Sequence, residues 1–308
     1  MVPLMRRALV LLACLSTACS AGSSRSTAGD ASAPGDGGAN LGDAGDEADA
    51  PAPCSAPPDM RPEGGTCVLD ATGNVTDLSG AGLPQLVITM CSPTICYGGR
   101  ADDAGAYDLP IGDFLDTANY AVHADGRPDH AVDYHRLAAG EPEVIDVDMQ
   151  LPTLPPSAVS LPPDGSPASS VTVGDVTLQI AAGTTFDLDI EDYGTTAGRI
   201  LRVASVPLTS APPYAAANSV AAIYALAPSG AKPSVPMGVS VRNAAALPAS
   251  AAVDILVLSD DYFSTPPTVG QLLVQASGHV SADGTTIQSD PGQGIDEITW
   301  LGIRVKGQ

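Results

Sequence analysis

The chain has 308 residues, only 16% of them charged, and a formal net charge of −22 at pH 7. That acidity disfavours nucleic acid as a partner, because phosphates are bound by Lys and Arg, and it disfavours electrostatic attraction to an anionic membrane. The length is enough for two ordinary domains, while 32 Gly and 28 Pro interrupt the chain too often for long helices.

Residues 1–18 have the pattern of a secretory signal peptide. Arg6 and Arg7 precede the eight apolar residues 8–15, which are too few to span a bilayer, since a spanning helix needs about 20 residues. Residues 20–52 offer almost nothing apolar against which an N-terminal helix could pack, so a buried helix is the weaker interpretation. We therefore expect an exported protein. No other stretch approaches the apolar length of a membrane span.

The sequence Leu15-Ser16-Thr17-Ala18-Cys19 resembles the lipobox of bacterial lipoproteins. In that family the cysteine becomes the first residue of the mature chain and carries acyl chains, palmitate among them. Ser16 stands where the family usually has leucine, and Leu15 lies one position further from the cysteine. The resemblance implies a lipid anchor at Cys19, with plain secretion as the alternative. Ser20 after the cysteine favours the outer membrane or cell surface.

Residues 19–53 are predicted to form a disordered acidic linker, because they contain one leucine and no aromatic residue and cannot bury enough apolar surface to order themselves. Such a tether would hold the folded part away from a membrane. A second, Pro-rich linker is predicted over residues 152–169, stiffer and closer to polyproline II.

Residues 54–151 are predicted to form a β-sandwich. In residues 144–151 apolar and polar side chains alternate, which places Ile145, Val147 and Met149 on one face of a half-buried strand. Further strands are expected at residues 86–90, 106–109 and 120–124, with turns such as Asp125-Gly126 between them. Short strands at close spacing are typical of antiparallel sandwiches.

This region resembles the carboxypeptidase regulatory-like module, a small transthyretin-like sandwich. The resemblance rests on residues 73–77, on the segment Asp102-Asp103-Ala104-Gly105-Ala106-Tyr107-Asp108-Leu109, and on Tyr120-Ala121-Val122. Gly99 and Arg100 depart from the small residues usual before the first Asp. The family module is not a peptidase, so the resemblance implies a structural or binding role.

Four cysteines lie in this region: Cys54, Cys67, Cys91 and Cys96. An even number in an exported chain predicts two disulfides, for which three pairings are possible. The shortest loops favour Cys54–Cys67 with Cys91–Cys96. A structural zinc site usually has two close cysteine pairs, whereas twelve residues separate Cys54 from Cys67, so we predict no metal.

His123, His130 and His135 lie near Asp125, Asp129 and Asp133 in the sequence. Their spacing does not match tight metal-ligand spacings, and the turn at residues 126–128 divides them. We therefore interpret them as polar residues of a surface hairpin. Asp102 and Asp103 lack the alternation of a calcium loop and are expected to cap a turn.

Residues 170–308 are predicted to form a second β-sandwich. Strands are expected at residues 176–180, 201–208, 220–225, 237–241, 253–258, 271–275 and 298–305. The region resembles ZU5-like sandwich modules of bacterial surface proteins, on the motifs at residues 176–183, 223–230, 280–284 and 294–300. Ala227 stands where a glycine or another small residue is expected. This resemblance implies scaffolding or surface display.

No catalytic motif is present: the sequence has neither a Gly-x-Ser-x-Gly elbow nor a His-Glu-x-x-His segment. The adjacent pairs Asp260-Asp261 and Glu191-Asp192 point to opposite sides of a strand and form no acid–base pair by themselves, although carboxylates from distant strands could converge. We expect no enzyme and no cofactor.

The sequence therefore predicts an all-β, non-enzymatic surface lipoprotein that makes structural or adhesive contacts with a surface protein or glycan through sandwich loops. Polysaccharide binding is the alternative, on the premise that Tyr193, Tyr214 and Tyr262 in Gly- and Pro-rich loops are exposed. Trp300 lies in an apolar strand and is expected in the core.

Overall fold

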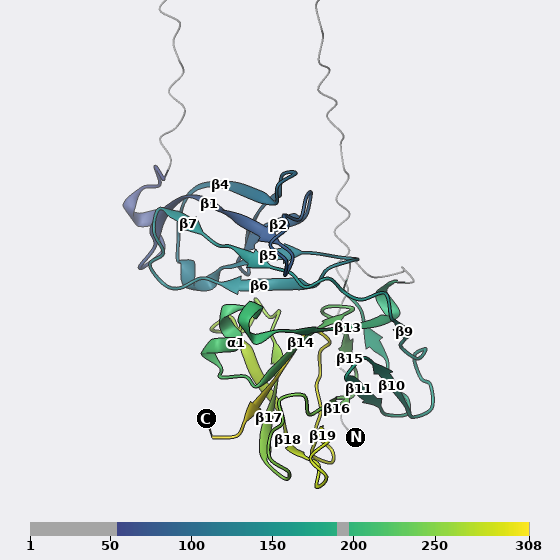
Figure 1. Ribbon diagram of the computed structural model, residues 1–308. Coiled ribbons are helices and arrows are strands. Elements are labelled where there is room, and N and C mark those ends of the chain that lie inside the picture. The colour runs from purple at the N-terminus through teal and green to yellow at the C-terminus, as the bar shows by residue number, and fades with distance from the viewer. Residues whose placement is uncertain (1–53, 190–196, 308) are drawn as a thin grey trace, which may run out of the picture. The chain divides into compact units, whose positions relative to one another are not determined.

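The computed structural model describes residues 54–189 and 197–307 (Figure 1). Almost every element in these ranges is a strand, which confirms the all-β prediction. The predicted signal peptide, Cys19 and the linker at residues 19–53 lie outside the described residues, as do Glu191, Asp192 and Tyr193. No helix in the described ranges is long and apolar enough to cross a membrane.

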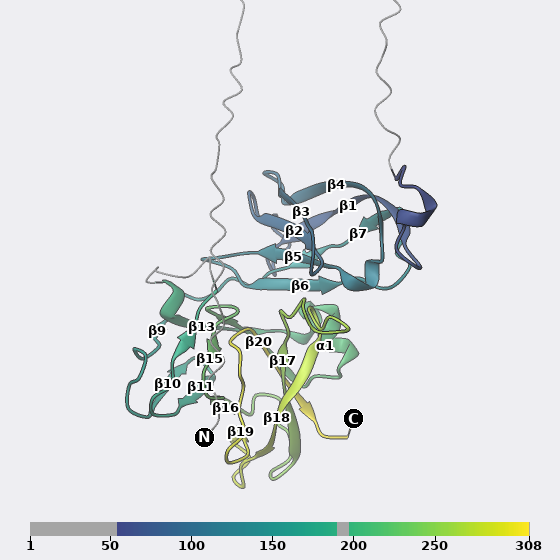
Figure 2. The ribbon, with the colours of Figure 1, turned by 180° about the vertical axis from the view of Figure 1, so that it is seen from behind.

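Two sheets form a sandwich from residues 66–150. In one, β1 (Thr66–Thr76) lies between β4 (Ala106–Leu115) and β7 (Val144–Asp146), and β8 (Met149–Gln150) also pairs with β1. The other sheet has the order β3-β2-β5-β6, with bounds Cys96–Arg100, Val87–Cys91, Ala121–Asp125 and Val132–Arg136. Figure 2 shows the two layers from behind.

The structure confirms which side chains of residues 144–151 are buried and which are exposed. Ile145, Val147 and Met149 are buried in the core between the two sheets, while Asp146 and Asp148 are exposed. The segment forms two short strands rather than one, and both pair in parallel with β1. The period of two in the side chains therefore predicted the buried face correctly although the hydrogen bonding is interrupted.

Residues 159–305 contribute a ten-stranded sheet in the order β10-β11-β16-β19-β18-β17-β20-β14-β13-β9. In that order the bounds are Ser169–Val173, Val176–Ile180, Gly238–Arg242, Thr286–Ser289, Leu272–Val280, Ala252–Leu258, Trp300–Val305, Ala222–Ala227, Ile200–Val206 and Val159–Ser160. A separate pair is formed by β12 (Phe186–Asp187) and β15 (Lys232–Pro233). Side chains from both ends of the large sheet, such as Val171 and Leu201, belong to one core, so the sheet folds over on itself.

The helical elements are short. The α-helix α1 spans Pro213–Ala217, and single 3-10 turns span Pro58–Met60, Thr117–Asn119, Ala197–Arg199 and Leu208–Ser210. The Pro-rich segment 152–169 contributes β9 and buries Leu154 and Leu161, so it packs against the sheets. The predicted module boundaries at residues 151 and 170 stay a prediction.

Strands β14, β17 and β20 are covered on both faces, which explains their continuous apolar sequences. On β14, Tyr224 and Leu226 face the core of the large sheet, while Ile223 and Ala225 face a second cluster that also contains Val132 and Tyr134 of β6. Trp300 is 1% exposed in this second cluster, as predicted for a core residue, and its Nε1 donates a hydrogen bond to the Val132 carbonyl at 2.7 Å. The sandwich of residues 66–150 and the large sheet thus share an apolar junction.

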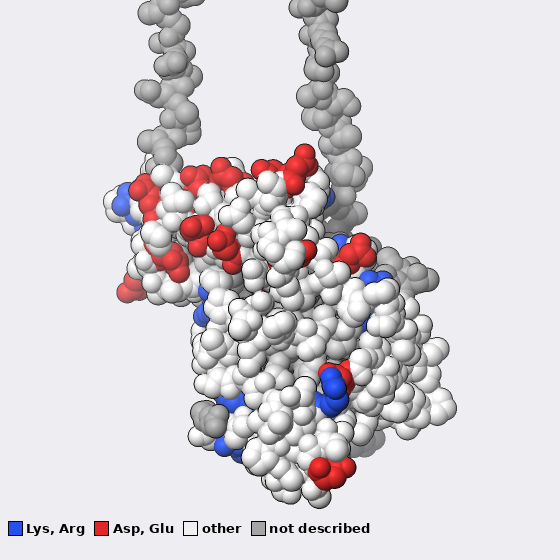
Figure 3. All heavy atoms as spheres, in the orientation of Figure 1, with Lys and Arg blue, Asp and Glu red and all other residues white. Residues whose placement is uncertain are grey.

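Acidic side chains gather over the sheet β4-β1-β7 on the face drawn in Figure 3, whereas the face over the large sheet carries few charges. The exposed aspartates of these strands include Asp108 and Asp113 on β4 and Asp146 on β7. A solvated surface of one sign favours solubility and repels other anionic surfaces.

Candidate binding site

The four predicted cysteines form two disulfides, Cys54–Cys67 and Cys91–Cys96, which is the pairing that the short loops favour. The second bridge closes the turn between β2 and β3, where the Ser92 hydroxyl accepts hydrogen bonds from the N–H groups of Thr94 and Ile95. The same turn forms one wall of a surface groove.

The histidines and aspartates of residues 123–135 do lie on a hairpin, which β5 and β6 form, but its strands are largely buried, so the prediction of a surface position is wrong. Asp133 is only 4% exposed, and the His123 ring stacks on Tyr134 with 4.5 Å between centroids. Burial lowers the pKa of His123 to about 4, so the imidazole is neutral at pH 7. Across residues 54–189 and 197–307 no three His, Cys, Asp or Glu side chains gather as metal ligands.

Two of the three tyrosines expected as exposed platforms are not available. The Tyr214 hydroxyl donates a hydrogen bond to Asp133 Oδ1 at 2.7 Å, and the Tyr262 hydroxyl is buried without a hydrogen-bond partner. Tyr193 lies outside the described residues. The premise for polysaccharide binding through Tyr214 and Tyr262 is therefore wrong, because neither ring presents a free face with a solvated hydroxyl.

Carboxylates from distant segments do converge at one place. Lys232 Nζ lies 2.8 Å from Asp260 Oδ1, and Glu297, 6% exposed, lies beside Asp260. Burial first, and then the Asp260 charge, raise the pKa of Glu297 to about 9, so this carboxyl group is protonated at pH 7. Asp261, adjacent to Asp260, accepts hydrogen bonds within its own loop instead, from the Phe263 and Ser264 N–H groups.

Loops from separate parts of the chain enclose a groove of about 640 Å³ that we call the loop groove. Its walls are the disulfide-closed turn at residues 92–94, the end of β4 with the following turn at residues 114–120, and the loop at residues 263–267. The groove combines the rings of Phe114, Tyr120 and Phe263 with the polar side chains of Asp116 and Asn119.

Phe263 is the exposed aromatic ring of the groove, with 80% of its surface in water. Its loop is nevertheless fixed: Asp261 Oδ1 accepts hydrogen bonds from the backbone N–H groups of Phe263 and Ser264, at 2.7 and 3.1 Å. The Asp261 carbonyl accepts two more, from Thr268 and Val269 N–H. The Asx turn at Asp261 thus orders the backbone of the loop that presents the Phe263 ring to solvent.

The opposite wall is ordered as well. The Arg61 guanidinium lies over the Phe114 ring at 4.1 Å, and the Asn119 amide donates to Asp116 Oδ2 at 2.7 Å. The Arg136 guanidinium donates to the carbonyls of Pro267 and Ala118, which ties the Phe263 loop to the turn after β4. A groove with fixed walls loses little conformational entropy when it binds a partner.

Sequence reasoning selected Tyr262 and missed its neighbour Phe263. Both lie in the same Gly- and Pro-rich loop, and composition alone does not say which ring turns outward. The usable signal was Asp261, whose carboxylate two residues before Phe263 is typical of an Asx turn.

No family model matches the chain, and no curated protein matches it. Among solved structures, the chain is similar to the crystal structure of a "putative carbohydrate binding protein" from Bacteroides uniformis. The identity is 10%, the match covers 78% of this chain and 80% of the other, and the TM-score is 0.22. A TM-score this low gives no basis for transferring a ligand.

Proposed function

We propose that the protein is a non-enzymatic, exported lipoprotein, anchored in an outer membrane or cell surface through Cys19, that makes structural or adhesive contacts through its sandwich loops. The observation that carries the proposal is Phe263, 80% exposed on a loop held by hydrogen bonds at the edge of the loop groove. Burying such a ring on association contributes about 1.5–3 kcal/mol.

The proposal includes the two module resemblances, carboxypeptidase regulatory-like for residues 54–151 and ZU5-like for residues 170–308. Both imply binding or display, and the placement of the loop groove is compatible with that role, because loops at one end of a sandwich are a common binding surface.

The test measures binding of the full chain to an envelope fraction from the producing cells, immobilised on a surface. Phe263→Ala should weaken binding at least about tenfold, as expected for an aromatic side chain central to an interface. Val274→Ala is the matched control, since Val274 is another exposed apolar residue, 51% exposed, outside the loop groove. Equal binding by both variants and the unaltered chain contradicts the proposal.

Polysaccharide binding is the second candidate, and a specific observation favours it. Phe114 and Phe263 line the same groove as the carboxylate of Asp116 and the amide of Asn119, and sugars combine apolar C–H faces with hydroxyl groups that such side chains recognise. A glycan array with the full chain separates the two candidates: signals lost in Phe263→Ala support polysaccharide binding, and a blank array with retained envelope binding supports a protein partner.

The lipid anchor has its own test, the intact mass of the native protein after membrane fractionation. An N-terminus at Cys19 that carries acyl mass supports the anchor. An unmodified N-terminus near Ser20 contradicts it and supports plain secretion.

A further inference from the structure

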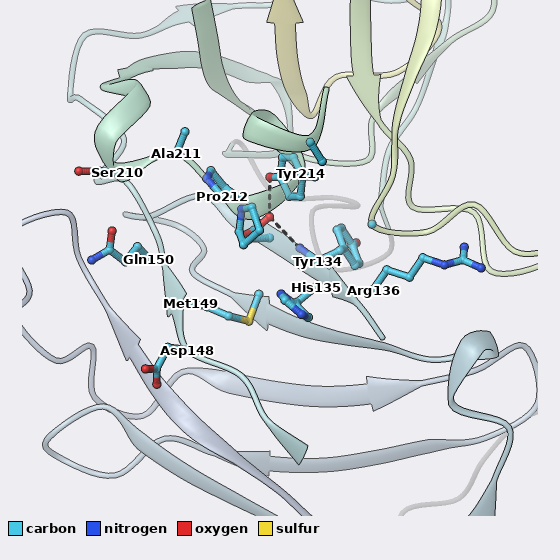
Figure 4. Close-up of a pocket in the computed structure, with 14 residues that line it drawn as sticks. Tyr134, His135, Arg136, Asp148, Met149, Gln150, Ser210, Ala211, Pro212 and Tyr214 are labelled. Atoms are coloured by element: carbon cyan, nitrogen blue, oxygen red, sulfur yellow. Dashed lines mark hydrogen bonds between the residues drawn. The ribbon is translucent and has the colours of Figure 1, made fainter. Parts of the chain in front are cut away.

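A second hollow of about 470 Å³ lies at the junction, since Tyr134 and Tyr214 of the junction cluster line it, and we call it the Tyr214 cavity (Figure 4). Asp148, Met149 and Gln150 line one side, and Ser210, Ala211, Pro212 and Tyr214 line the opposite side. Its volume lies within the range of about 300–1,000 Å³ that is usual for small-molecule sites. The proposed function makes no use of this cavity.

Asp133 of β6 lines the cavity and is 4% exposed. Its Oδ1 accepts hydrogen bonds from the Tyr214 hydroxyl at 2.7 Å and from the Tyr134 N–H at 2.9 Å. Both bonds end on the same oxygen, so Oδ2 has no partner among the described residues. Neither partner is a cation, and a buried carboxylate without a counter-charge is strongly destabilised in its ionised form.

The remaining ionisable groups of the described cavity lining form no ion pair with Asp133. They are Tyr134, His135, Arg136, Asp148 and Tyr214. Burial lowers the pKa of His135, so its ring is neutral at pH 7. The Arg136 guanidinium is bound to the Pro267 and Ala118 carbonyls, and in Figure 4 its side chain extends away from Tyr214. Asp148, exposed at the rim, adds a second negative charge.

The walls between these carboxylates are apolar. Pro213 begins α1 and Pro212 is its N-cap, the methyl groups of Ala211 and Ala217 flank them, and Met149 faces them from the other side. A ligand held here would contact carbon on two sides and a carboxylate at the buried end.

We propose that the Tyr214 cavity binds a small organic cation: an amine or guanidinium whose charged nitrogen bonds to Asp133 Oδ2 and whose carbon body packs against Pro212 and Met149. The cation supplies the counter-charge that the protein itself does not place beside Asp133, and the apolar walls replace water around the ligand's carbon atoms.

Proton linkage gives the proposal a signature. Burial raises the pKa of Asp133 to about 7, so at about pH 6 the empty cavity holds mostly the protonated acid. A bound cation favours the carboxylate, so binding at about pH 6 should release most of one proton. At about pH 8.5 the acid is already ionised, so release should vanish and the affinity should be higher.

The experiment is calorimetric titration of the full chain with benzylamine, and with benzyl alcohol as the neutral probe of similar shape. Repeating the titration in buffers of different ionisation enthalpy measures the released protons. We expect benzylamine to bind at least about tenfold more tightly than benzyl alcohol at about pH 8.5. Equal binding of both probes, or no binding of benzylamine, overturns the proposal, as does binding without proton release at about pH 6.

Two variants locate the site. Asp133→Asn should weaken benzylamine binding at least about tenfold and abolish proton release, while its amide oxygen can still accept from Tyr214. Glu143→Gln, at an exposed position outside the cavity, makes the same change in net charge and should bind as the unaltered chain. Equal losses in both variants would indicate a general charge effect and overturn the assignment. The titration of the unaltered chain decides the matter if Asp133→Asn does not fold.

Discussion

At the scale of single residues, buried polar groups connect segments that are far apart in the chain. The Trp300 indole N–H reaches the Val132 carbonyl, 168 positions away, and Tyr214 reaches Asp133 across 81 positions. Such bonds contribute little when made, but a broken one leaves a desolvated group without a partner.

Trp300→Phe tests this at the junction. The variant keeps an aromatic ring but loses the 2.7 Å bond to Val132, so we expect a loss of about 1–3 kcal/mol in the free energy of unfolding. Urea denaturation followed by circular dichroism measures it. Phe263→Ala is the control and should change stability by less than about 0.5 kcal/mol, because its ring is 80% exposed. Equal losses in the two variants would contradict this account.

Glu297 makes the stability of the fold depend on pH in a defined direction. Burial and the neighbouring Asp260 charge raise the pKa of Glu297 in the folded chain to about 9, above the ordinary value of 4.5 for a glutamate. The folded chain therefore retains a proton that the unfolded chain loses, and this group's contribution to stability falls as the pH rises from about 4.5 to about 9.

Glu297→Gln removes that titration. The difference in unfolding free energy between the variant and the unaltered chain should move in the variant's favour as the pH rises from about 5 to about 8. Urea midpoints across this range measure it. A difference that does not vary with pH would show that Glu297 does not titrate in this way.

At the scale of elements, the two disulfides close loops of different length. The residues of Cys54–Cys67 are 13 positions apart and those of Cys91–Cys96 are 5 apart. In the chain-entropy description the longer loop stabilises by about 3 kcal/mol and the shorter by about 2 kcal/mol.

Replacing both cysteines of a bridge by serine should therefore lower the free energy of unfolding more for Cys54 and Cys67 than for Cys91 and Cys96. Binding at the loop groove should show the opposite order. The Cys91 and Cys96 variant should weaken it more, because the turn that this bridge closes is a wall of the groove. Denaturation and envelope binding measured on the same two variants decide this. The reverse order in both measurements would contradict the roles given to the two bridges.

Elements with a clear period could be predicted from the sequence, and others could not. Apolar and polar side chains alternate in residues 176–180 and 144–151, and this pattern predicted which side chains are buried. The strand β6 was missed because its sequence, Val-Asp-Tyr-His-Arg, has a polar pattern. Asp133 is tolerated in its buried position by the Tyr214 hydroxyl, which comes from a helix much later in the chain, and no local signal predicts that partner.

The location of the loop groove also could not be predicted from the sequence. The expectation of binding through sandwich loops needed only the strand pattern, but the groove brings together residues 92–94, 114–120 and 263–267. Their meeting depends on the Arg136 hydrogen bonds and on the junction around Trp300.

At the scale of the whole described structure, the apolar junction makes the two regions interdependent. Val132 and Tyr134 of the first sandwich belong to the same cluster as Ile223 and Trp300 of the large sheet. Regions that bury a continuous apolar cluster together are expected to unfold together.

The chain contains one tryptophan, Trp300, and it lies in this junction. Its fluorescence should therefore change in the same denaturation transition as the circular dichroism of the strands. Coincident urea midpoints are the expected result. A fluorescence change that clearly precedes the loss of strand signal would show that the junction opens while both sheets persist.

The Cys54–Cys67 bridge has a mechanical consequence. Cys67 lies near the start of β1, the strand that pairs with β4 on one side and with β7 on the other. A pulling force applied to the chain before Cys54 would pass through the sulfur atoms into β1 and bypass the backbone of residues 55–66. If the chain is tethered as we propose, the bridge sets where tension enters the fold.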